Sequence, residues 1–494
     1  MKPKIEYKPI SSPEDQNSVA LQMAQLQDNA RRYYRCAIVI TFMVTILFCL
    51  MAAQLLLLPL LCTSSTMETE TTTNQEQKCN DVCNMVLVES IPEGLVYPEN
   101  STSNPSVFET WLNLLSEAKS SVDIASFYWT LTNNDTRTHH PSADQGERIL
   151  QELLNLKQRG IHLRVAVNPV GSKENADINA LRDSGAEVRI VDLPHLTNGV
   201  LHTKFWVVDG KHLYIGSANM DWRALTQVKE LGSTVFNCSC LAQDLEKIFD
   251  AYWTLGNPNA TIPSPWPDNF STIYNKDTPM EMTVNNTQSL VYLSSSPPPL
   301  SAKGRTEDID AIISVIDDAK KFVYISVMDY TPTEEFSSPR RYWPEIDDHL
   351  RKAVYERYVT VRLLISCWAN SKPPMFPFLK SMAALNSSKP HYNVEVKIFV
   401  VPVSEEQKHI PFGRVNHNKY MVTDRVAYIG TSNWSGDYFI RTAGSALVVN
   451  QTCATNATNT MQKQLQDVFM RDWTSNYSHP ISTMIGFKKK CLFQ

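Results

Sequence analysis

The sequence predicts an α/β fold with two pseudo-symmetric sandwich halves, each built on a mixed sheet, and a single transmembrane helix ahead of them. Three observations predict this arrangement: a long uncharged stretch near the amino terminus, alternating strand and helix patterns after it, and a motif that recurs about two hundred residues downstream. With 494 residues, 43% of them hydrophobic, the chain has room for two or three domains with a large core.

Residues 36–62 are the predicted membrane segment. They carry no charge and exceed the roughly 20 apolar residues that span a bilayer. They also start too far from Met1, and run too long, for the apolar core of a cleavable signal peptide. Three arginines stand immediately before them, so the positive-inside rule places residues 1–35 in the cytosol. We therefore expect a single-pass type II signal anchor with a luminal bulk.

The segments on either side of the membrane segment are short and polar. In the tail, Tyr7-Lys8-Pro9-Ile10 fits the Tyr-x-x-apolar pattern of endosomal sorting signals, which predicts a sorting adaptor as a partner. Residues 63–78 are rich in Thr and Glu and have almost nothing to bury. They predict an exposed luminal stem at which proteolysis releases a soluble form.

The cysteines after the membrane segment indicate an oxidising compartment. A zinc site formed by Cys79, Cys83, Cys238 and Cys240 is the alternative to disulfides. Because disulfides dominate in an oxidising lumen, we expect Cys79 and Cys83 to pair with Cys238 and Cys240, in either connectivity. We also expect Cys367 to pair with Cys491, which leaves Cys453 as the odd thiol.

Asn-x-Ser/Thr sequons are frequent in the same part of the chain and predict a glycosylated luminal face. They occur at Asn100, Asn134, Asn259, Asn269, Asn285, Asn386, Asn450, Asn456 and Asn476. Asn433 also matches the pattern, but it lies inside the recurring motif and is expected to stay bare.

Two halves, at residues 79–256 and 301–494, are predicted to repeat one order of elements. Each shows a strand, a helix and two further strands before its copy of the motif. These are residues 121–129, 147–157, 162–167 and 186–191 in the first half, and 322–330, 346–355, 360–366 and 394–401 in the second. The Pro- and Asn-rich residues 257–300 are the predicted connector. Halves placed face to face would bring the two motif copies together at a pseudo-twofold axis.

The recurring motif supplies the candidate chemistry. Its first copy contains His202, Lys204, Asp209, Ser217 and Asn219, and its second contains His417, Lys419, Asp424, Thr431 and Asn433. An Asp-Gly turn between apolar runs predicts a hairpin in the first copy, and residues two apart on a strand share a face. We expect the aspartates to fix the hairpins, and the hydroxyl and amide side chains to hold substrate. Two facing copies supply a nucleophile, an acid and a cationic cradle, which suits phosphodiester cleavage.

The doubled pattern HxK(x)4D(x)6G[ST]xN is the signature of the phospholipase D superfamily, which this sequence resembles. One departure is visible, since five residues instead of six separate Asp424 from Gly430. The segments LVESIPEGL, ASFYWTLTNND and YIGTSNWSG look like its lysosomal exonuclease branch. The resemblance implies 5′-to-3′ cleavage of single-stranded DNA and RNA, which limits the nucleic acid available to endolysosomal sensors. The enzyme would reach late endosomes and lysosomes through the endoplasmic reticulum and Golgi.

The resemblance also implies a phosphohistidine intermediate, formed without a metal or cofactor. No P-loop, HExxH motif or clustered metal-binding carboxylates stand in the sequence. Glu230 follows His202 at the spacing at which related enzymes place the carboxylate that orients the nucleophile, whereas the second copy offers Gly444. We therefore expect Glu230 to contact His202, which makes His202 the nucleophile and His417 the acid.

Two other function classes remain open at this stage. One is a lysosomal phospholipase D or transphosphatidylase acting on glycerophospholipids. The other is a luminal binding protein with a relic site, which the completeness of both motif copies disfavours. A formal charge of −5 argues against a protein that coats duplex nucleic acid. A homodimer is a further arrangement that the sequence leaves open.

Overall fold

In the computed structural model, residues 79–169, 175–452, 459–483 and 491 are described, and they belong to one compact unit. The predicted cytosolic tail, sorting signal, membrane segment and stem lie outside these residues, as do Cys453 and Asn456. Within the described ranges, no helix combines the length and apolar character that crossing a membrane requires.

The first half is built on a seven-stranded mixed sheet. Its strands lie in the order β1 (Val82–Ser90), β9 (Glu230–Phe236), β7 (His212–Gly216), β6 (Phe205–Val208), β2 (Ser121–Ser126), β4 (His162–Val167) and β5 (Glu187–Ile190). Neighbours are antiparallel from β1 to β2 and parallel from β2 to β5.

The second half repeats that sheet with the same order and the same strand directions. Its strands are β11 (Thr287–Ser296), β22 (Gly444–Asn450), β21 (Val426–Gly430), β20 (Lys419–Thr423), β13 (Phe322–Val327), β16 (Thr360–Ser366) and β19 (Val394–Phe399). This match confirms the two pseudo-symmetric halves with mixed sheets. At its edges the second sheet adds β10 (Met280–Val284) and β23 (Ser478–Pro480).

The segment expected to be a connector, 257–300, contributes to the sheets. Its second part contains the whole of β10 and β11, and β10 pairs in parallel with β1 of the first half. Alternating burial in Met280–Val284 explains the strand, because every second side chain turns to the core. The connection between the halves is therefore partly a structural strand pair.

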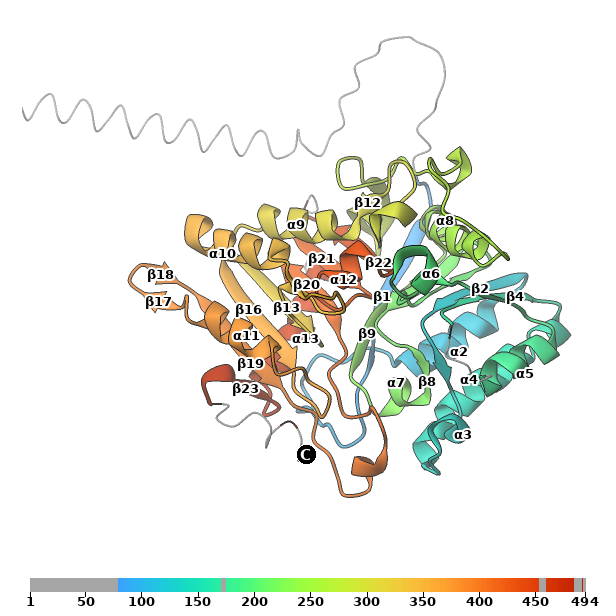
Figure 1. Ribbon diagram of the computed structural model, residues 1–494, viewed down its shortest axis with the longest axis horizontal. Coiled ribbons are helices and arrows are strands. Elements are labelled where there is room, and N and C mark those ends of the chain that lie inside the picture. The colour runs from blue at the N-terminus through green and yellow to red at the C-terminus, as the bar shows by residue number, and fades with distance from the viewer. Residues whose placement is uncertain (1–78, 170–174, 453–458, 484–490, 492–494) are drawn as a thin grey trace, which may run out of the picture. The chain divides into compact units, whose positions relative to one another are not determined.

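Equivalent helices cover the two sheets (Figure 1). They are α2 (Val107–Glu117), α4 (Asp144–Leu154), α5 (Ala176–Ser184) and α8 (Ser239–Leu255) in the first half, and α9 (Asp308–Asp318), α10 (Glu345–Arg357), α11 (Met375–Ala383) and α13 (Met461–Thr474) in the second. Short elements are α3 (Asn133–Thr136), α6 (Leu193–Thr197), α7 (Trp222–Thr226), α12 (Asp437–Ile440), β3 (Trp129–Thr130), β8 (Met220–Asp221), β12 (Thr306–Glu307), β14 (Thr333–Glu334), β15 (Arg341–Tyr342), β17 (Ser387–Ser388) and β18 (His391–Tyr392).

Burial on both sides of each sheet fixes this arrangement. The outer core of the first half contains Trp111 of α2 stacked on Trp206 of β6, with ring centroids 4.8 Å apart. A separate core joins the halves, where α8 and α13 pack between the sheets with Phe249 and Phe469 fully buried. Because both faces are covered, central strands such as β6 (FWVV) and β13 (FVYISV) are almost continuously apolar.

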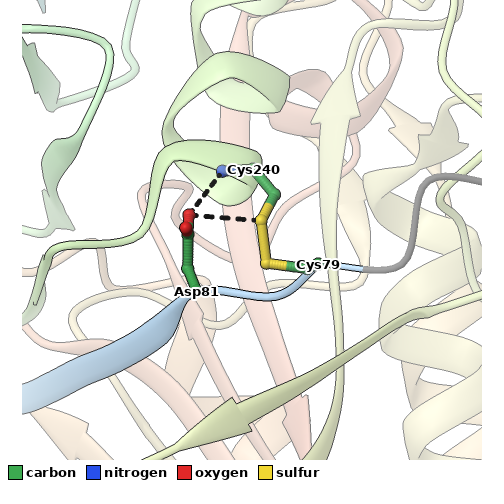
Figure 2. Close-up of side chains that lie close together, drawn as sticks. All are labelled: Cys79, Asp81 and Cys240. Carbon is green, nitrogen blue, oxygen red and sulfur yellow. Dashed lines mark hydrogen bonds between the residues drawn. A yellow bond between two sulfur atoms is a disulfide. The ribbon is translucent and has the colours of Figure 1, made fainter.

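Three disulfides tie the described part of the chain. They join Cys79 to Cys240, Cys83 to Cys238, and Cys367 to Cys491, so the expected pairing is confirmed and its connectivity resolved. Figure 2 shows Asp81 beside the first of them. The carboxylate of Asp81 accepts the main-chain N–H groups of Ser239 at 2.5 Å and Cys240 at 3.3 Å. It thus caps the first turn of α8 from another element.

The sequons differ in accessibility. Exposed side chains are those of Asn100, Asn134, Asn259, Asn269, Asn386 and Asn476, and Asn450 is half-buried. Asn285 is different, because its amide bonds both the N–H and the carbonyl of Met85, at 2.9 and 2.7 Å. That pairing occupies the side chain, so the structure argues against a glycan at Asn285. Glycosylation at the exposed positions stays a prediction.

Candidate active site

The two motif copies meet where the main chain of each half forms a hydrogen bond with the main chain of the other half. The N–H of His202 donates to the carbonyl of Ala443 at 2.9 Å, and the N–H of His417 donates to the carbonyl of Lys229 at 2.8 Å. Ala443 and Lys229 immediately precede β22 and β9, which are equivalent strands. The copies are therefore placed face to face by reciprocal bonds, as the sequence predicts.

Three ionisable side chains of the motifs are buried at this junction, and a fourth, that of His417, is partly buried with 12% of it exposed. His202, Lys204 and Lys419 are 4%, 3% and 1% exposed. Each lysine ammonium donates to the carbonyl of its own motif histidine, Lys204 to His202 and Lys419 to His417 at 2.7 Å. These bonds hold both ammonium groups beside the imidazoles.

Glu230 contacts His417 and not His202, so the sequence-based assignment was wrong on this contact. Both carboxylate oxygens of Glu230 lie 2.9 Å from Nδ1 of His417. The reason is the reciprocal bonding, since the carbonyl of Lys229 holds the His417 main chain and the next side chain meets its ring. Residue spacing along one motif copy does not reveal a partner that comes from the other half.

Among the residues that the structure describes, no carboxylate bonds to the His202 ring as Glu230 bonds to that of His417. The place equivalent to that of Glu230 belongs to Gly444, where a Cβ atom would lie 2.1 Å from Oγ of Ser432 and 3.0 Å from Oγ of Ser296. Nδ1 of His202 is buried and has no hydrogen-bond partner among the described residues. The two imidazoles are therefore chemically unequal.

Ser217 and Thr431 do not present free hydroxyls to a substrate, which corrects their predicted role. Oγ of Ser217 donates to the carbonyl of Leu231 at 3.1 Å and accepts its N–H at 3.0 Å. Oγ1 of Thr431 makes the same two bonds with Ser445. Both side chains are fully buried and join β7 to β9 and β21 to β22.

The side chains of the two motif asparagines face the junction, and each bonds to a tyrosine hydroxyl. Nδ2 of Asn219 donates to the hydroxyl of Tyr128 at 3.3 Å, and Nδ2 of Asn433 to the hydroxyl of Tyr438 at 3.0 Å. Oδ1 of each amide is buried without a partner among the described residues. Asn433 is 2% exposed, in keeping with the expectation that it carries no glycan.

Asp209 and Asp424 fix the hairpins, as expected, at the strand ends remote from the lysines. The carboxylate of Asp209 accepts the main-chain N–H groups of Lys119, Ser120 and Ser121. That of Asp424 accepts those of Lys320 and Lys321, both at 3.0 Å. Partial burial acts to raise the pKa of Asp209, but the hydrogen bonds from these N–H donors outweigh it, so the pKa is lowered. Asp209 and Asp424 therefore have a structural role, although they belong to the catalytic motif.

Burial and unbalanced positive charge govern the protonation of the site. Burial, followed by the charges of Lys204 and Lys419, lowers the pKa of His202 well below its ordinary value. Burial also lowers the pKa of His417, but the Glu230 carboxylate acts in the opposite direction. Burial lowers the pKa of Lys419 to about 7, against the charges of Glu230 and Asp329. A dehydrated site with excess positive charge favours an anion.

Aromatic side chains that the motif does not contain line the same site. The His202 ring lies between Phe127, at 5.0 Å between centroids, and Tyr438, at 4.9 Å. Asp329 is 6% exposed near Lys419, and burial raises its pKa to about 6. Tyr128 and Phe127 follow β2, and the sequence segment ASFYW gave no signal that distinguishes them from core residues.

Among the described residues, a single group of three potential metal ligands gathers, and it lies away from the motifs. It consists of Cys79, Asp81 and Cys240. The two sulfurs form a disulfide (Figure 2), so the thiolates that zinc requires are not available. The alternative of a zinc site at these cysteines is therefore excluded in this structure.

Comparisons with known proteins agree with this geometry. Residues 98–404 match a family model described as "PLD3/4, PLD-like domain". This chain belongs to that PLD-like family. It is 69% identical to the Xenopus tropicalis protein named 5′-3′ exonuclease PLD3, over the full length of both chains. It is 51% identical to the human protein of the same name, over 98% of each chain.

A second group of relatives within the PLD-like family is also recognisable. The mouse protein named 5′-3′ exonuclease PLD4 is 47% identical, over 84% of this chain and 83% of that protein. Because the first relatives span the entire chain, their similarity includes the second motif, which lies beyond the residues that the family model matches.

Proposed function

We propose that this chain is a phosphodiesterase that degrades single-stranded DNA and RNA from the 5′ end through a phosphohistidine intermediate. The observation that carries the proposal is the pair of unequal imidazoles beside Lys204 and Lys419, with His202 buried and His417 bonded to Glu230. Full-length relatives named 5′-3′ exonucleases support the substrate class and the direction.

His417 is the better nucleophile of the two histidines. Its Nδ1–H donates to Glu230, so the lone pair of Nε2 is the one available to attack phosphorus. The ring gains positive charge as the Nε2–P bond forms, and the carboxylate stabilises that charge. This reverses the roles expected from the sequence, because those roles depended on a contact between Glu230 and His202.

In the first step, Nε2 of His417 bonds to phosphorus and the P–O bond to the leaving strand end breaks. Protonated His202 gives its proton to the departing oxygen. In the second step, neutral His202 takes a proton from water, the water oxygen bonds to phosphorus, and the N–P bond breaks. The product is a phosphate monoester, and both imidazoles return to their first state.

Substrate binding itself prepares His202 for its role as acid. In the empty site burial, and after it the charges of the two lysines, lower the pKa of His202. A phosphodiester anion between Lys204 and Lys419 offsets that positive charge and raises the pKa, so His202 holds a proton when the leaving group needs it. The amides of Asn219 and Asn433 would complete the hydrogen bonds to the non-bridging oxygens.

Leaving-group replacement tests the assignment of roles. The full-length chain, purified in detergent, is given a thymidine p-nitrophenyl phosphodiester, whose leaving group needs no proton. We expect His202→Ala to perform the first step and to accumulate phosphohistidine on His417, while His417→Ala stays inactive. Rescue of His417→Ala, with phosphate on His202, would show that the roles are the opposite ones.

A second experiment tests the substrate class and direction. Single-stranded oligonucleotides labelled at one end, with the 5′ hydroxyl free or blocked, are compared with glycerophospholipid vesicles at acidic pH. We expect stepwise shortening of the free strand alone. Turnover of phospholipid without shortening of either strand would instead identify a phospholipase D.

The cellular setting is part of the same proposal. Residues 36–62 anchor the chain as a type II membrane protein, and the enzyme works in the lumen of late endosomes and lysosomes. Three disulfides support an oxidising, luminal environment for the folded part. Immunofluorescence of the wild type and of a Tyr7→Ala variant tests the sorting signal. A homodimer remains a prediction.

A further inference from the structure

The hairpin of β14 and β15 presents an exposed aromatic ring beside the active site. Phe336, in its loop, is 66% exposed. Its ring centroid lies 6.4 Å from that of Tyr438, which in turn lies 4.9 Å from the His202 imidazole. Tyr438 therefore links Phe336 to the reacting groups, within the span of two or three nucleotides at roughly 3.4 Å or more each.

The backbone beneath this ring is fixed. Oδ2 of Asp437, on α12, accepts the main-chain N–H groups of Glu335 and, at 3.2 Å, of Phe336. The hydroxyl of Ser337 donates to Glu334 at 2.6 Å. Phe336 is thus held in place with most of its ring in solvent. An anchored, exposed aromatic ring gives the fold little packing energy and is suited to contact a ligand.

Basic side chains stand in the same hairpin and next to the ring. The ammonium of Lys372 lies 4.8 Å from the Phe336 centroid and is paired with Glu335. Arg340 and Arg341, in the same loop and strand, are exposed, and neither forms an ion pair with another described residue. Two such guanidinium groups next to an exposed ring match a chain of alternating bases and phosphates.

We propose that Phe336 stacks on a base of the single strand two or three nucleotides from the phosphate that reacts, while Arg340 and Arg341 bind the phosphates beside it. This inference rests on the proposed exonuclease function and adds a subsite that favours a polymer over a small diester. Stacking tolerates any base, because every base has an aromatic face, so the subsite suits both DNA and RNA.

The test compares two substrates on the full-length chain. KM and kcat are measured for a 5′-free oligonucleotide of about 15 nucleotides and for the thymidine p-nitrophenyl diester, which is too short to reach Phe336. We expect Phe336→Ala to raise the oligonucleotide KM relative to the diester KM by about tenfold, within a range of roughly 5 to 100 for the removal of one stacked base. Phe336→Trp, which keeps an aromatic ring, should have an oligonucleotide KM close to that of the wild type.

Two further variants sharpen the result. Tyr355→Ala, which removes a ring that is 67% exposed on α10, is the matched control and should leave both KM values unchanged. Arg340→Gln combined with Arg341→Gln should reduce the slope of log KM against log salt by about 0.7 for each phosphate that the variant no longer binds. Thermal melting of each variant excludes unfolding as the cause.

Each contrary result has a distinct meaning. If Phe336→Ala shortens the oligonucleotide with the wild-type KM, the subsite is absent while the exonuclease proposal stands. If Phe336→Ala instead loses binding to anionic phospholipid vesicles and keeps the oligonucleotide KM, this surface contacts membranes and the inference is wrong. If the wild type leaves every oligonucleotide intact, the proposed function fails and the subsite with it.

Discussion

Glu230 of the first half holds His417 of the second half, with both carboxylate oxygens 2.9 Å from Nδ1 of the imidazole. The two residues are 187 positions apart in the chain. Neither half contains this pair alone, because β9 brings the carboxylate and the segment before β20 brings the ring. The internal duplication therefore produced one site with two different imidazoles rather than two equal sites.

Glu230→Gln is expected to lower kcat/KM by up to about 10⁴-fold, the loss seen when the carboxylate behind the histidine of a serine protease becomes an amide. An amide cannot stabilise the charge that the ring gains on attack. Steady-state kinetics with an oligonucleotide checks this, and Glu281→Gln, which changes a half-buried carboxylate on β10, a strand outside both motif copies, is the control. Equal activity of the two variants would show that Glu230 has no part in the reaction.

The repeat, the hairpins and the identity of the motif side chains were predictable, because each is encoded locally. Alternating strand and helix patterns gave β2, α4, β4, β5 and their counterparts within a few residues. The partner of Glu230 was not predictable in the same way. It depends on the main-chain bond between Lys229 and His417, which crosses from one half to the other.

The roles of the motif hydroxyls were missed for a related reason. A Ser or Thr in a motif has the same appearance whether its hydroxyl is free or bonded to the main chain. Ser217 and Thr431 prove to be bonded to Leu231 and Ser445, on strands whose register the sequence does not specify. Tyr128 and Tyr438 were missed because an aromatic residue is by default assigned to the core.

A buried ion cluster beneath Glu230 makes Lys229 important for stability. Lys229 is fully buried and lies 2.8 Å from Asp472 and 3.4 Å from Glu89. Lys229→Met removes a positive charge that pairs with both carboxylates, and it is expected to lower the free energy of unfolding by about 3–5 kcal/mol. The exposed pair Lys463–Asp467 provides the control, and Lys463→Met should change stability by less than about 0.5 kcal/mol. If denaturant titration found the same loss of stability in Lys229→Met and Lys463→Met, the importance of burial for the Lys229 cluster would be refuted.

The same cluster predicts how stability depends on pH. Burial acts to raise the pKa of Glu89, but the charges of Arg471 and Lys229 outweigh it and lower that pKa to about 2. A carboxyl whose pKa is lower in the folded state stabilises the fold above its unfolded value of 4.5. That contribution is lost as the pH falls from 4.5 toward 2. Melting temperatures should therefore hold down to about pH 4.5 and drop below it. Lys229→Met removes one of the charges that lower the pKa of Glu89, so in that variant the drop should be smaller and should end at a higher pH.

The disulfides are expected to add to the resistance of the fold to heat. Cys83 and Cys238 close a loop of 155 residues between β1 and α8. Cys83→Ser with Cys238→Ser should lower stability by about 2–5 kcal/mol. Peptide mapping without reduction should recover the pairs Cys79–Cys240, Cys83–Cys238 and Cys367–Cys491. Recovery of the crossed pairs Cys79–Cys238 and Cys83–Cys240 would contradict the connectivity.

The dependence of activity on pH should be bell-shaped, with its maximum below neutrality. On the acid side, kcat/KM falls as the attacking imidazole of His417 becomes protonated. On the alkaline side, it falls as His202 loses the proton that the leaving group needs, and as Lys419, with a pKa of about 7, loses its charge. Burial lowers the pKa of each of these three groups, so both sides of the bell lie at lower pH than they would for free side chains.

The Glu230 carboxylate partly opposes the effect of burial on His417 and Lys419, because it raises the pKa of each. In Glu230→Gln that opposition is removed, so both sides of the residual activity should shift toward lower pH. A shift of either side toward higher pH would contradict the proposed electrostatics.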